Sequence, residues 1–219
     1  MIYDSGIWKI ELKKRTDDFN KLVQETEFSL DWYSDEEDDG LTASYKFFIE
    51  LQKYCFYSAV ITRKFLESNR LSDELRLTKY SVNHYKKKTE KILTKDNFDS
   101  VDEEYETKRK LTKHLTLEKI CHLFIHSFIF TPKLIEYKID VDQPDDDIEN
   151  WEITGVSGVY INTDRYKEKE VYFFGLDFIL KLFTEVYTDN IVYISEDRFF
   201  GKVIRSRNYP EDYEERTKK

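Results

Sequence analysis

The sequence is poor in residues that interrupt regular structure or hold metals. Its 219 residues include only 6 Gly, 3 Pro, 2 Cys and 4 His. So few Gly and Pro residues favour long regular elements over a loop-rich β-sandwich. The two cysteines, Cys55 and Cys121, form no Cys-x-x-Cys pair. We therefore expect two reduced thiols inside the core rather than a disulfide or a set of zinc ligands.

Long apolar runs are also missing. The longest, residues 121–130, is interrupted by His122, His126 and Ser127, and it is much shorter than the roughly 20 residues that a membrane span requires. Residues 1–15 lack the apolar segment of a secretory signal. These features predict a soluble, cytoplasmic protein without a membrane partner.

Aromatic and acidic residues are abundant instead. The chain contains 16 Tyr, 16 Phe and 3 Trp, and its 44 acidic residues against 35 basic ones give a net charge of −9. The aromatic side chains bury large areas, which indicates a folded protein. An acidic surface repels phosphate backbones, so a nucleic-acid partner is not expected, whereas a basic protein partner suits this charge.

Helical periodicity dominates the first part of the chain. Apolar residues recur at helical spacing in residues 5–29 and over seven turns in residues 42–69. Residues 116–130 are apolar on all sides, with Thr116 suited to an N-cap and Pro132 to a stop. We expect the segments 42–69 and 116–130 to be long buried helices that pack together.

A β-rich pattern follows. Residues 151–163 and 171–174 are rich in β-branched and aromatic residues, with a charged loop between them. Gly155 and Gly158 suggest a bend or bulge. Residues 176–187 have the pattern of an amphipathic helix.

The fold class predicted is therefore α+β, with a helix-rich N-terminal two-thirds, then a small antiparallel hairpin or meander and a helix. We expect residues 1–138 to form a helical core region. Residues 150–200 then pack on it within one domain, and residues 201–219 form a polar tail.

The segment between the two long helices is ambiguous. Residues 75–82 alternate like an extended chain, residues 86–95 carry five lysines, and residues 96–106 are acidic. We expect the two runs of opposite charge to be neighbours in space.

Two histidines have a spacing that can chelate zinc. His122 and His126 are four residues apart, which places both rings on one side of a helix. The metalloprotease motif requires Glu directly after the first His, but Leu123 is found there. We therefore favour buried structural histidines and expect no metal or other cofactor, and we keep His122 and His126 as weak candidate ligands.

One short motif resembles that of a ribonuclease family. Arg109 and His114 match the pattern Arg-x4-His. This pattern is similar to that of the HEPN ribonucleases, small helical domains that cleave RNA without a metal. The resemblance implies that Arg109 and His114 act on the 2′-hydroxyl and the scissile phosphate. His126 is a further weak candidate for catalysis. At the position directly after the arginine, where the family usually has a polar residue, this chain has the charged Lys110.

The absence of other catalytic motifs favours a non-catalytic function. There is no glycine-rich phosphate loop and no Gly-x-Ser-x-Gly elbow. Together with the acidic charge, this favours a protein-interaction module of the immunity or regulator kind. A HEPN-like ribonuclease is the alternative, and the oligomeric state is left open.

Overall fold

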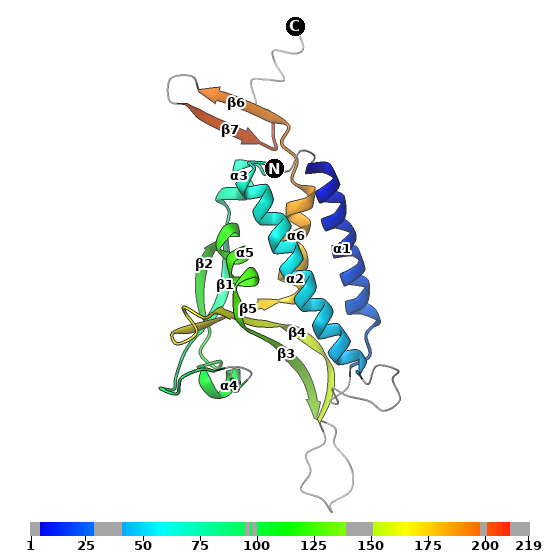
Figure 1. The fold of residues 1–219 in the computed structure, drawn as a ribbon, viewed down its shortest axis with the longest axis vertical. Coiled ribbons are helices and arrows are strands. Elements are labelled where there is room, and N and C mark those ends of the chain that lie inside the picture. Colours follow the sequence, from blue (N-terminus) through cyan, green and yellow to red (C-terminus); the bar gives the residue numbers. More distant parts are fainter. Residues whose placement is uncertain are drawn as a thin grey trace, which may run out of the picture.

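The chain forms an α+β fold in which helices pack on one face of an antiparallel sheet (Figure 1), so the predicted class is confirmed. The computed structural model describes residues 5–28, 41–94, 97, 100–138, 151–197 and 201–210. In the order in which they lie across the sheet, the strands are β2 (Leu111–Thr116), β1 (Lys79–Lys86), β5 (Glu170–Gly175), β4 (Trp151–Thr163) and β3 (Ser127–Lys138). Strands β2 and β3 are thus the two edges of this sheet.

Two long helices match the predicted periodicity. Helix α1 (Ser5–Glu25) contacts α2 (Ala43–Glu67) and α6 (Leu176–Thr188). The side chain of Thr42 caps α2 by accepting a hydrogen bond from the Tyr45 amide at 3.4 Å. Just beyond the end of α2, Asn69 adopts a left-handed conformation with φ of 54°, one that Asn tolerates better than most residues.

Helix α5 (Leu117–Ile125) is shorter than the sequence predicted. Thr116 is its N-cap as expected, but the prediction of a helix up to Phe130 is wrong, because β3 begins at Ser127. Ile129 and Phe130 are buried on opposite faces of the sheet. A short apolar run fits either a buried helix or a strand, and pairing with β4 decides the outcome here.

The region predicted to be helical also supplies strands. Strands β1, β2 and β3 all lie within residues 1–138, and β3 pairs with β4 from the following region. Strand β2 was missed because it is an edge strand with only two apolar residues, Leu111 and Leu115. The short helix α3 (Asp73–Leu77) precedes β1, so the extended pattern predicted for residues 75–82 is correct only from Lys79 onward.

The irregularity predicted around Gly155 and Gly158 is confirmed. The β3–β4 register shifts between Lys133 and Leu134 and again between Ile135 and Glu136. Gly158 lies opposite Gly175 of β5, and a Cβ atom at Gly158 would lie 2.2 Å from the Phe174 carbonyl oxygen. Any larger residue at this position would force the two strands apart.

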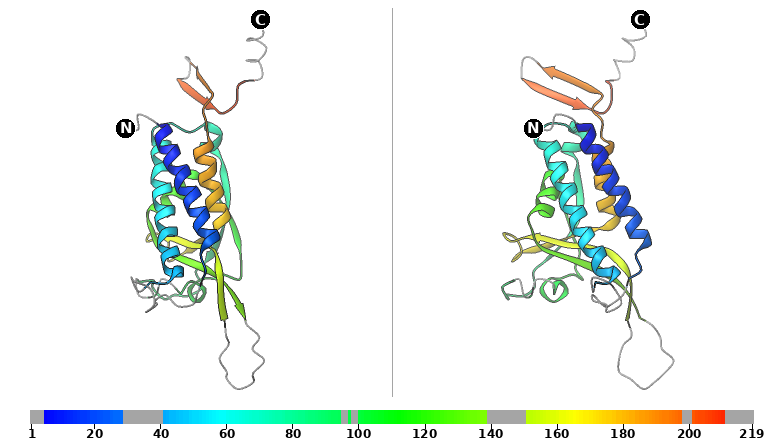
Figure 2. Two further views of the ribbon diagram at one scale, coloured as in Figure 1. Left: turned by 90° about the vertical axis from the view of Figure 1, so that its right-hand side faces the viewer. Right: turned by 45° about the vertical axis from the view of Figure 1, so that its right-hand side comes forward.

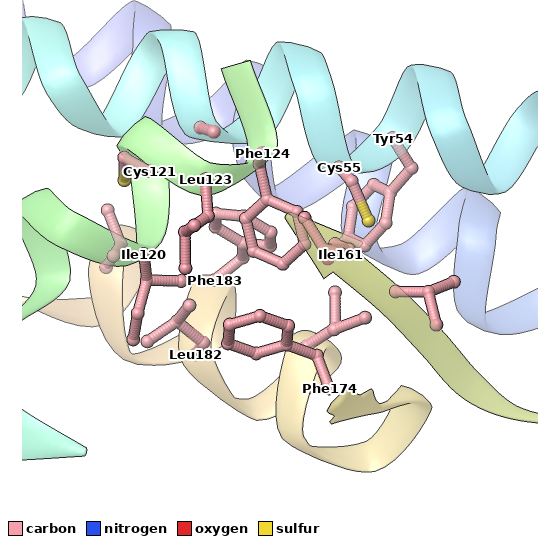
Figure 3. Close-up of a cluster of buried hydrophobic side chains, with 14 of the residues drawn as sticks. Tyr54, Cys55, Ile120, Cys121, Leu123, Phe124, Ile161, Phe174, Leu182 and Phe183 are labelled. Atoms are coloured by element: carbon pink, nitrogen blue, oxygen red, sulfur yellow. The ribbon is translucent and has the colours of Figure 1, made fainter. Parts of the chain in front are cut away.

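The helix-facing side of the sheet carries the larger core (Figure 3). Phe124 of α5 contacts Phe174 of β5 and Phe183 of α6, with ring centroids 5.1 and 6.1 Å apart. Helices α2 and α5 pack together, as predicted. Cys55 and Cys121 are free thiols within this core, and burial raises the pKa of both.

The opposite side of the sheet is covered by residues 87–94 and 100–105, which include the one-turn helix α4 (Val101–Glu104). Leu93, Val101 and Tyr105 pack there against residues of the sheet. The predicted proximity of the basic and acidic runs is confirmed, because Lys91 Nζ lies 3.6 Å from a Glu104 carboxylate oxygen.

A hairpin projects beyond the end of the helices (Figures 1 and 2). It consists of β6 (Tyr193–Asp197) and β7 (Lys202–Ser206), so the predicted tail from residue 201 onward begins with a strand instead. Residues 211–219 of that tail lie outside the described residues.

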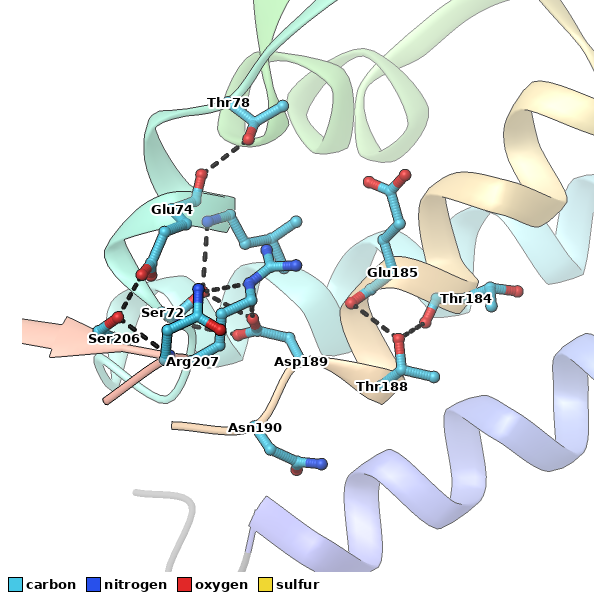
Figure 4. Close-up of polar contacts among 12 residues, drawn as sticks. Ser72, Glu74, Thr78, Thr184, Glu185, Thr188, Asp189, Asn190, Ser206 and Arg207 are labelled. Carbon is cyan, nitrogen blue, oxygen red and sulfur yellow. Dashed lines mark hydrogen bonds and ion pairs between the residues drawn. The ribbon is translucent and has the colours of Figure 1, made fainter. Parts of the chain in front are cut away.

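Buried Asp189 fastens the base of this hairpin to the rest of the molecule (Figure 4). Its carboxylate accepts hydrogen bonds from the Ser72 amide at 2.7 Å and the Ser72 hydroxyl at 2.6 Å, and pairs with Arg207 Nε at 3.2 Å.

Candidate binding groove

An open groove lies where α2 passes β3, an edge strand of the sheet. It consists of two hollows of about 410 and 710 Å³, which share Gln52 of α2 and Phe130 of β3. We call the first the aromatic end and the second the acidic end. Phe130 also contacts Phe48 of α2, with ring centroids 5.9 Å apart, so the walls of the groove are held together by packing.

The aromatic end is lined from α2, α5 and the start of β3. Two of its α2 residues, Phe56 and Tyr57, are 42% and 46% exposed, although both are large aromatic side chains. Phe128 of β3 lines the same hollow, with Lys167 Nζ 3.7 Å from its ring centroid. The Arg15 guanidinium similarly lies 4.9 Å from the centroid of Tyr57.

The acidic end is lined from α2, α4, β3 and β4. Asp102 and Glu103 of α4 and Glu136 of β3 are exposed here. Within the described residues, none of these three carboxylates takes part in an ion pair. Lys133, which also lines this hollow, has its Nζ 5.9 and 5.5 Å from the ring centroids of Tyr160 and Phe173.

The edge of β3 is partly blocked against strand addition. Pro132 has no amide N–H to donate to an incoming strand. The carbonyl oxygens of Lys133 and Ile135 accept hydrogen bonds from the Ser157 and Thr154 side chains of β4, the strand that is paired with β3. Pro132 therefore makes β3 a poorer template for a further strand.

The zinc candidates lie together but do not form a ligand set. The rings of His122 and His126 are 4.7 Å apart. His122 is partly buried, and burial followed by the charge of Lys119 lowers its pKa. His126 is exposed, so its interpretation as a buried structural histidine is wrong. Among the residues that the structure places, no third Cys, Asp, Glu or His completes a group able to hold a metal ion.

The structure places the ribonuclease candidates in different elements. Arg109 lies in an exposed turn before β2, and His114 lies in β2, where its Nδ1 is 3.2 Å from Ser81 Oγ of β1. His126 follows the last residue of α5, roughly 14 Å of helix axis away from β2. The resemblance implied a small helical domain, whereas Arg109 and His114 lie in a turn and a strand.

A coupled polar cluster cross-links three strands on the helix-facing side. Glu170 of β5 pairs with Lys113 of β2 at 2.6 Å and accepts a hydrogen bond from Tyr172. His84 Nδ1 of β1 lies 3.1 Å from Glu170, at ion-pairing distance but without hydrogen-bond alignment. Because Glu170 of β5 contacts side chains of β1 and β2, the cluster links the three strands.

The pKa shifts of this cluster follow from those contacts. Burial alone would raise the pKa of Glu170, but hydrogen bonds from Lys113 and Tyr172 outweigh it and hold the pKa below its usual range. Burial, followed by the hydrogen bond to Glu170, raises the pKa of Tyr172 to about 12.

Sequence reasoning did not find the groove. Its residues come from segments far apart in the chain and share no motif. One local signal was present: Phe56 and Tyr57 fall off the apolar face of α2, which is formed by residues such as Leu51, Cys55 and Phe65. Aromatic residues off a buried face are candidates for a binding surface.

Comparison with known proteins adds no assignment: no family model, curated protein sequence or solved structure matches this chain. None of the described helices is long and apolar enough to cross a membrane.

Proposed function

We propose that this protein is a non-catalytic protein-interaction module, of the regulator or immunity kind, and that its groove binds a segment of a partner protein. The observation that carries the proposal is the exposure of Phe56 and Tyr57 at the edge of an open hollow. Aromatic side chains are enriched among the residues that dominate binding energy in interfaces.

A rigid support strengthens this proposal. Phe56 and Tyr57 belong to α2, whose opposite face is anchored in the core by Leu51, Tyr54 and Cys55. Side chains held on such a helix lose little freedom on binding, which lowers the cost of association. The net charge of −9 favours a basic partner, because opposite charges steer encounter.

The ribonuclease alternative receives less support. Arg109 and His114 lie in an exposed turn and a strand of a five-stranded sheet. The acidic end of the groove, by contrast, is lined by Asp102, Glu103 and Glu136, which repel an RNA backbone.

The test uses a partner identified by capture from cells with the tagged full-length protein, then purified for calorimetric titration. The double variant Phe56→Ala, Tyr57→Ala should bind it at least about 10-fold more weakly, since truncating a central aromatic residue often costs about 2 kcal/mol. Ile10→Ala is the control, because Ile10 is 70% exposed on α1 and does not line the groove.

Equal affinity of the double variant and the wild type would reject the groove as the binding site. The variants must unfold at the wild-type temperature, which we expect because both side chains are substantially exposed.

A further inference from the structure

We propose that the groove recognises a short extended segment in two parts, with Lys or Arg side chains at the acidic end and an apolar side chain at the aromatic end. This inference rests on the proposed function and specifies the partner segment. It follows from the unequal charge of the two ends.

The acidic end carries an excess of negative charge, because three carboxylates line it against one lining cation, Lys133, among the described residues. Asp102, Glu103 and Glu136 line one hollow without an ion pair among the described residues, whereas other carboxylates nearby are paired. Glu104 lies 3.6 Å from Lys91 Nζ, and Glu50 lies 2.7 Å from Lys53 Nζ. Like charges gathered in one concavity raise the local negative potential, so a cationic side chain gains energy by entering it.

The aromatic end already holds cations. Lys167 lies against the ring of Phe128, Arg15 lies against Tyr57, and Lys53 lines the hollow. Lys167 is ion-paired with Asp164, Arg15 with Glu11 and Lys53 with Glu50. No carboxylate of the described residues lines this hollow, so no negative charge in it attracts a further cation. An apolar side chain, in contrast, can be buried against Phe56, Tyr57 and Phe128 without an electrostatic cost.

The length of the groove limits the segment. Along α2 the groove extends from Tyr45 to Tyr57, which is about 18 Å at 1.5 Å per helical residue. An extended chain rises about 3.3 Å per residue, so about six residues span it. The cationic and apolar side chains of the partner should therefore lie about four to six residues apart.

Fluorescence anisotropy with the full-length protein can test both parts. The probe is a labelled eight-residue peptide with two arginines at one end, two leucines at the other and Ser/Gly between them. Matched probes replace the arginines by Gln or Glu, or the leucines by Ser, and a single-stranded RNA octamer tests the alternative class of ligand. We expect at least about 10-fold weaker binding for the Gln and Ser peptides, and weaker binding of the parent peptide at high salt.

Protein variants assign the effect to the acidic end. One triple variant neutralises the groove, and its control removes the same net charge from exposed carboxylates of α1. The groove variant is Asp102→Asn, Glu103→Gln, Glu136→Gln, and the control is Asp17→Asn, Asp18→Asn, Glu25→Gln. The groove variant should lose most of the preference for Arg over Gln, while the control keeps it.

The outcomes separate this inference from the proposed function. If the Arg and Gln peptides bind equally, or if the groove variant keeps the preference, the two-part recognition is wrong. The groove would still be the binding site if the double variant Phe56→Ala, Tyr57→Ala binds the purified partner more weakly than the wild type does. Preference for the RNA octamer, or no binding of the parent peptide at millimolar concentration, would also overturn the inference.

Discussion

The two sides of the sheet are built in different ways. Among the described residues, the helix-facing side has one cluster of 29 buried apolar residues, all but Leu71 in helices and strands. The cluster on the opposite side has seven, of which Leu93, Val101 and Tyr105 come from residues 87–94 and 100–105. The larger cluster holds α2 in place, and the smaller one positions α4. The groove lies where these two layers meet at β3. Its α2 wall is supported by the larger cluster, whereas its α4 wall is supported by the smaller one.

The largest loss of stability is expected from a substitution in the larger core. Phe124 is 2% exposed and contacts rings from β5 and α6. Phe124→Ala should lower the free energy of unfolding by about 3–5 kcal/mol, through lost burial and the cavity that remains. Denaturant titration measures this value. A loss below about 1 kcal/mol would mean that this side does not dominate stability.

A smaller effect is expected on the opposite side. Leu93 is 1% exposed, but its cluster is small and its segment can relax, so Leu93→Ala should cost about 2–3 kcal/mol. Hydrogen exchange should show faster exchange in residues 87–105 and unchanged protection in α2. Equally faster hydrogen exchange in this segment and in α2 would show that the two sides of the sheet unfold as one unit.

A still smaller loss of stability is expected when the contacts of Glu170 are weakened, and this loss depends on pH. At pH 7 we expect Glu170→Gln to cost about 1–2 kcal/mol, because charge-assisted hydrogen bonds to Lys113 and Tyr172 are weakened. The pKa of Glu170 is lowered by folding from its ordinary value of 4.5. Its contribution is therefore complete above about pH 4.5 and is lost as the pH falls through the folded-state pKa.

Urea titrations of the wild type and Glu170→Gln at several pH values measure this effect. The difference between the two proteins should shrink steadily below about pH 4.5. A difference that stays constant down to pH 3 would contradict the proposed role of the carboxylate.

The smallest effect is expected for the histidine of the ribonuclease motif. His114 is exposed on β2, so His114→Ala should change stability by less than about 0.5 kcal/mol. We also expect expression of the wild type and of this variant to leave cellular RNA equally intact. RNA cleavage and growth arrest by the wild type that His114→Ala or Arg109→Ala abolishes would establish the ribonuclease alternative.

The sequence predicted the elements whose burial is periodic. Helices α1 and α2 follow from long runs at helical spacing, and Thr116 marks the start of α5 correctly. The end of α5 was wrong because Phe128–Phe130 is compatible with both structures, and its pairing partner β4 lies more than twenty residues away. Strands β2 and β7 were missed because their few apolar residues give no clear alternation.

The site was harder to predict than the fold. Histidine and arginine motifs drew attention to Arg109, His114, His122 and His126, which do not come together as one site. The groove instead combines residues of α2, α4 and β3, whose proximity depends on tertiary packing. Asp102 and Glu103 belong to the acidic run 96–106, and a sequence cannot show which carboxylates of such a run form ion pairs after folding.

Site-specific photo-crosslinking in cells tests the central claim most directly. Gln52 lines both hollows, so a photoreactive amino acid in its place samples the middle of the groove, and the same substitution at Ile10 is the control. We predict a discrete crosslinked protein at position 52 that is absent at position 10 and disappears when Phe56→Ala and Tyr57→Ala are added. Crosslinks of equal yield at both positions, or a crosslink at position 52 that survives those two changes, would contradict a partner-binding groove.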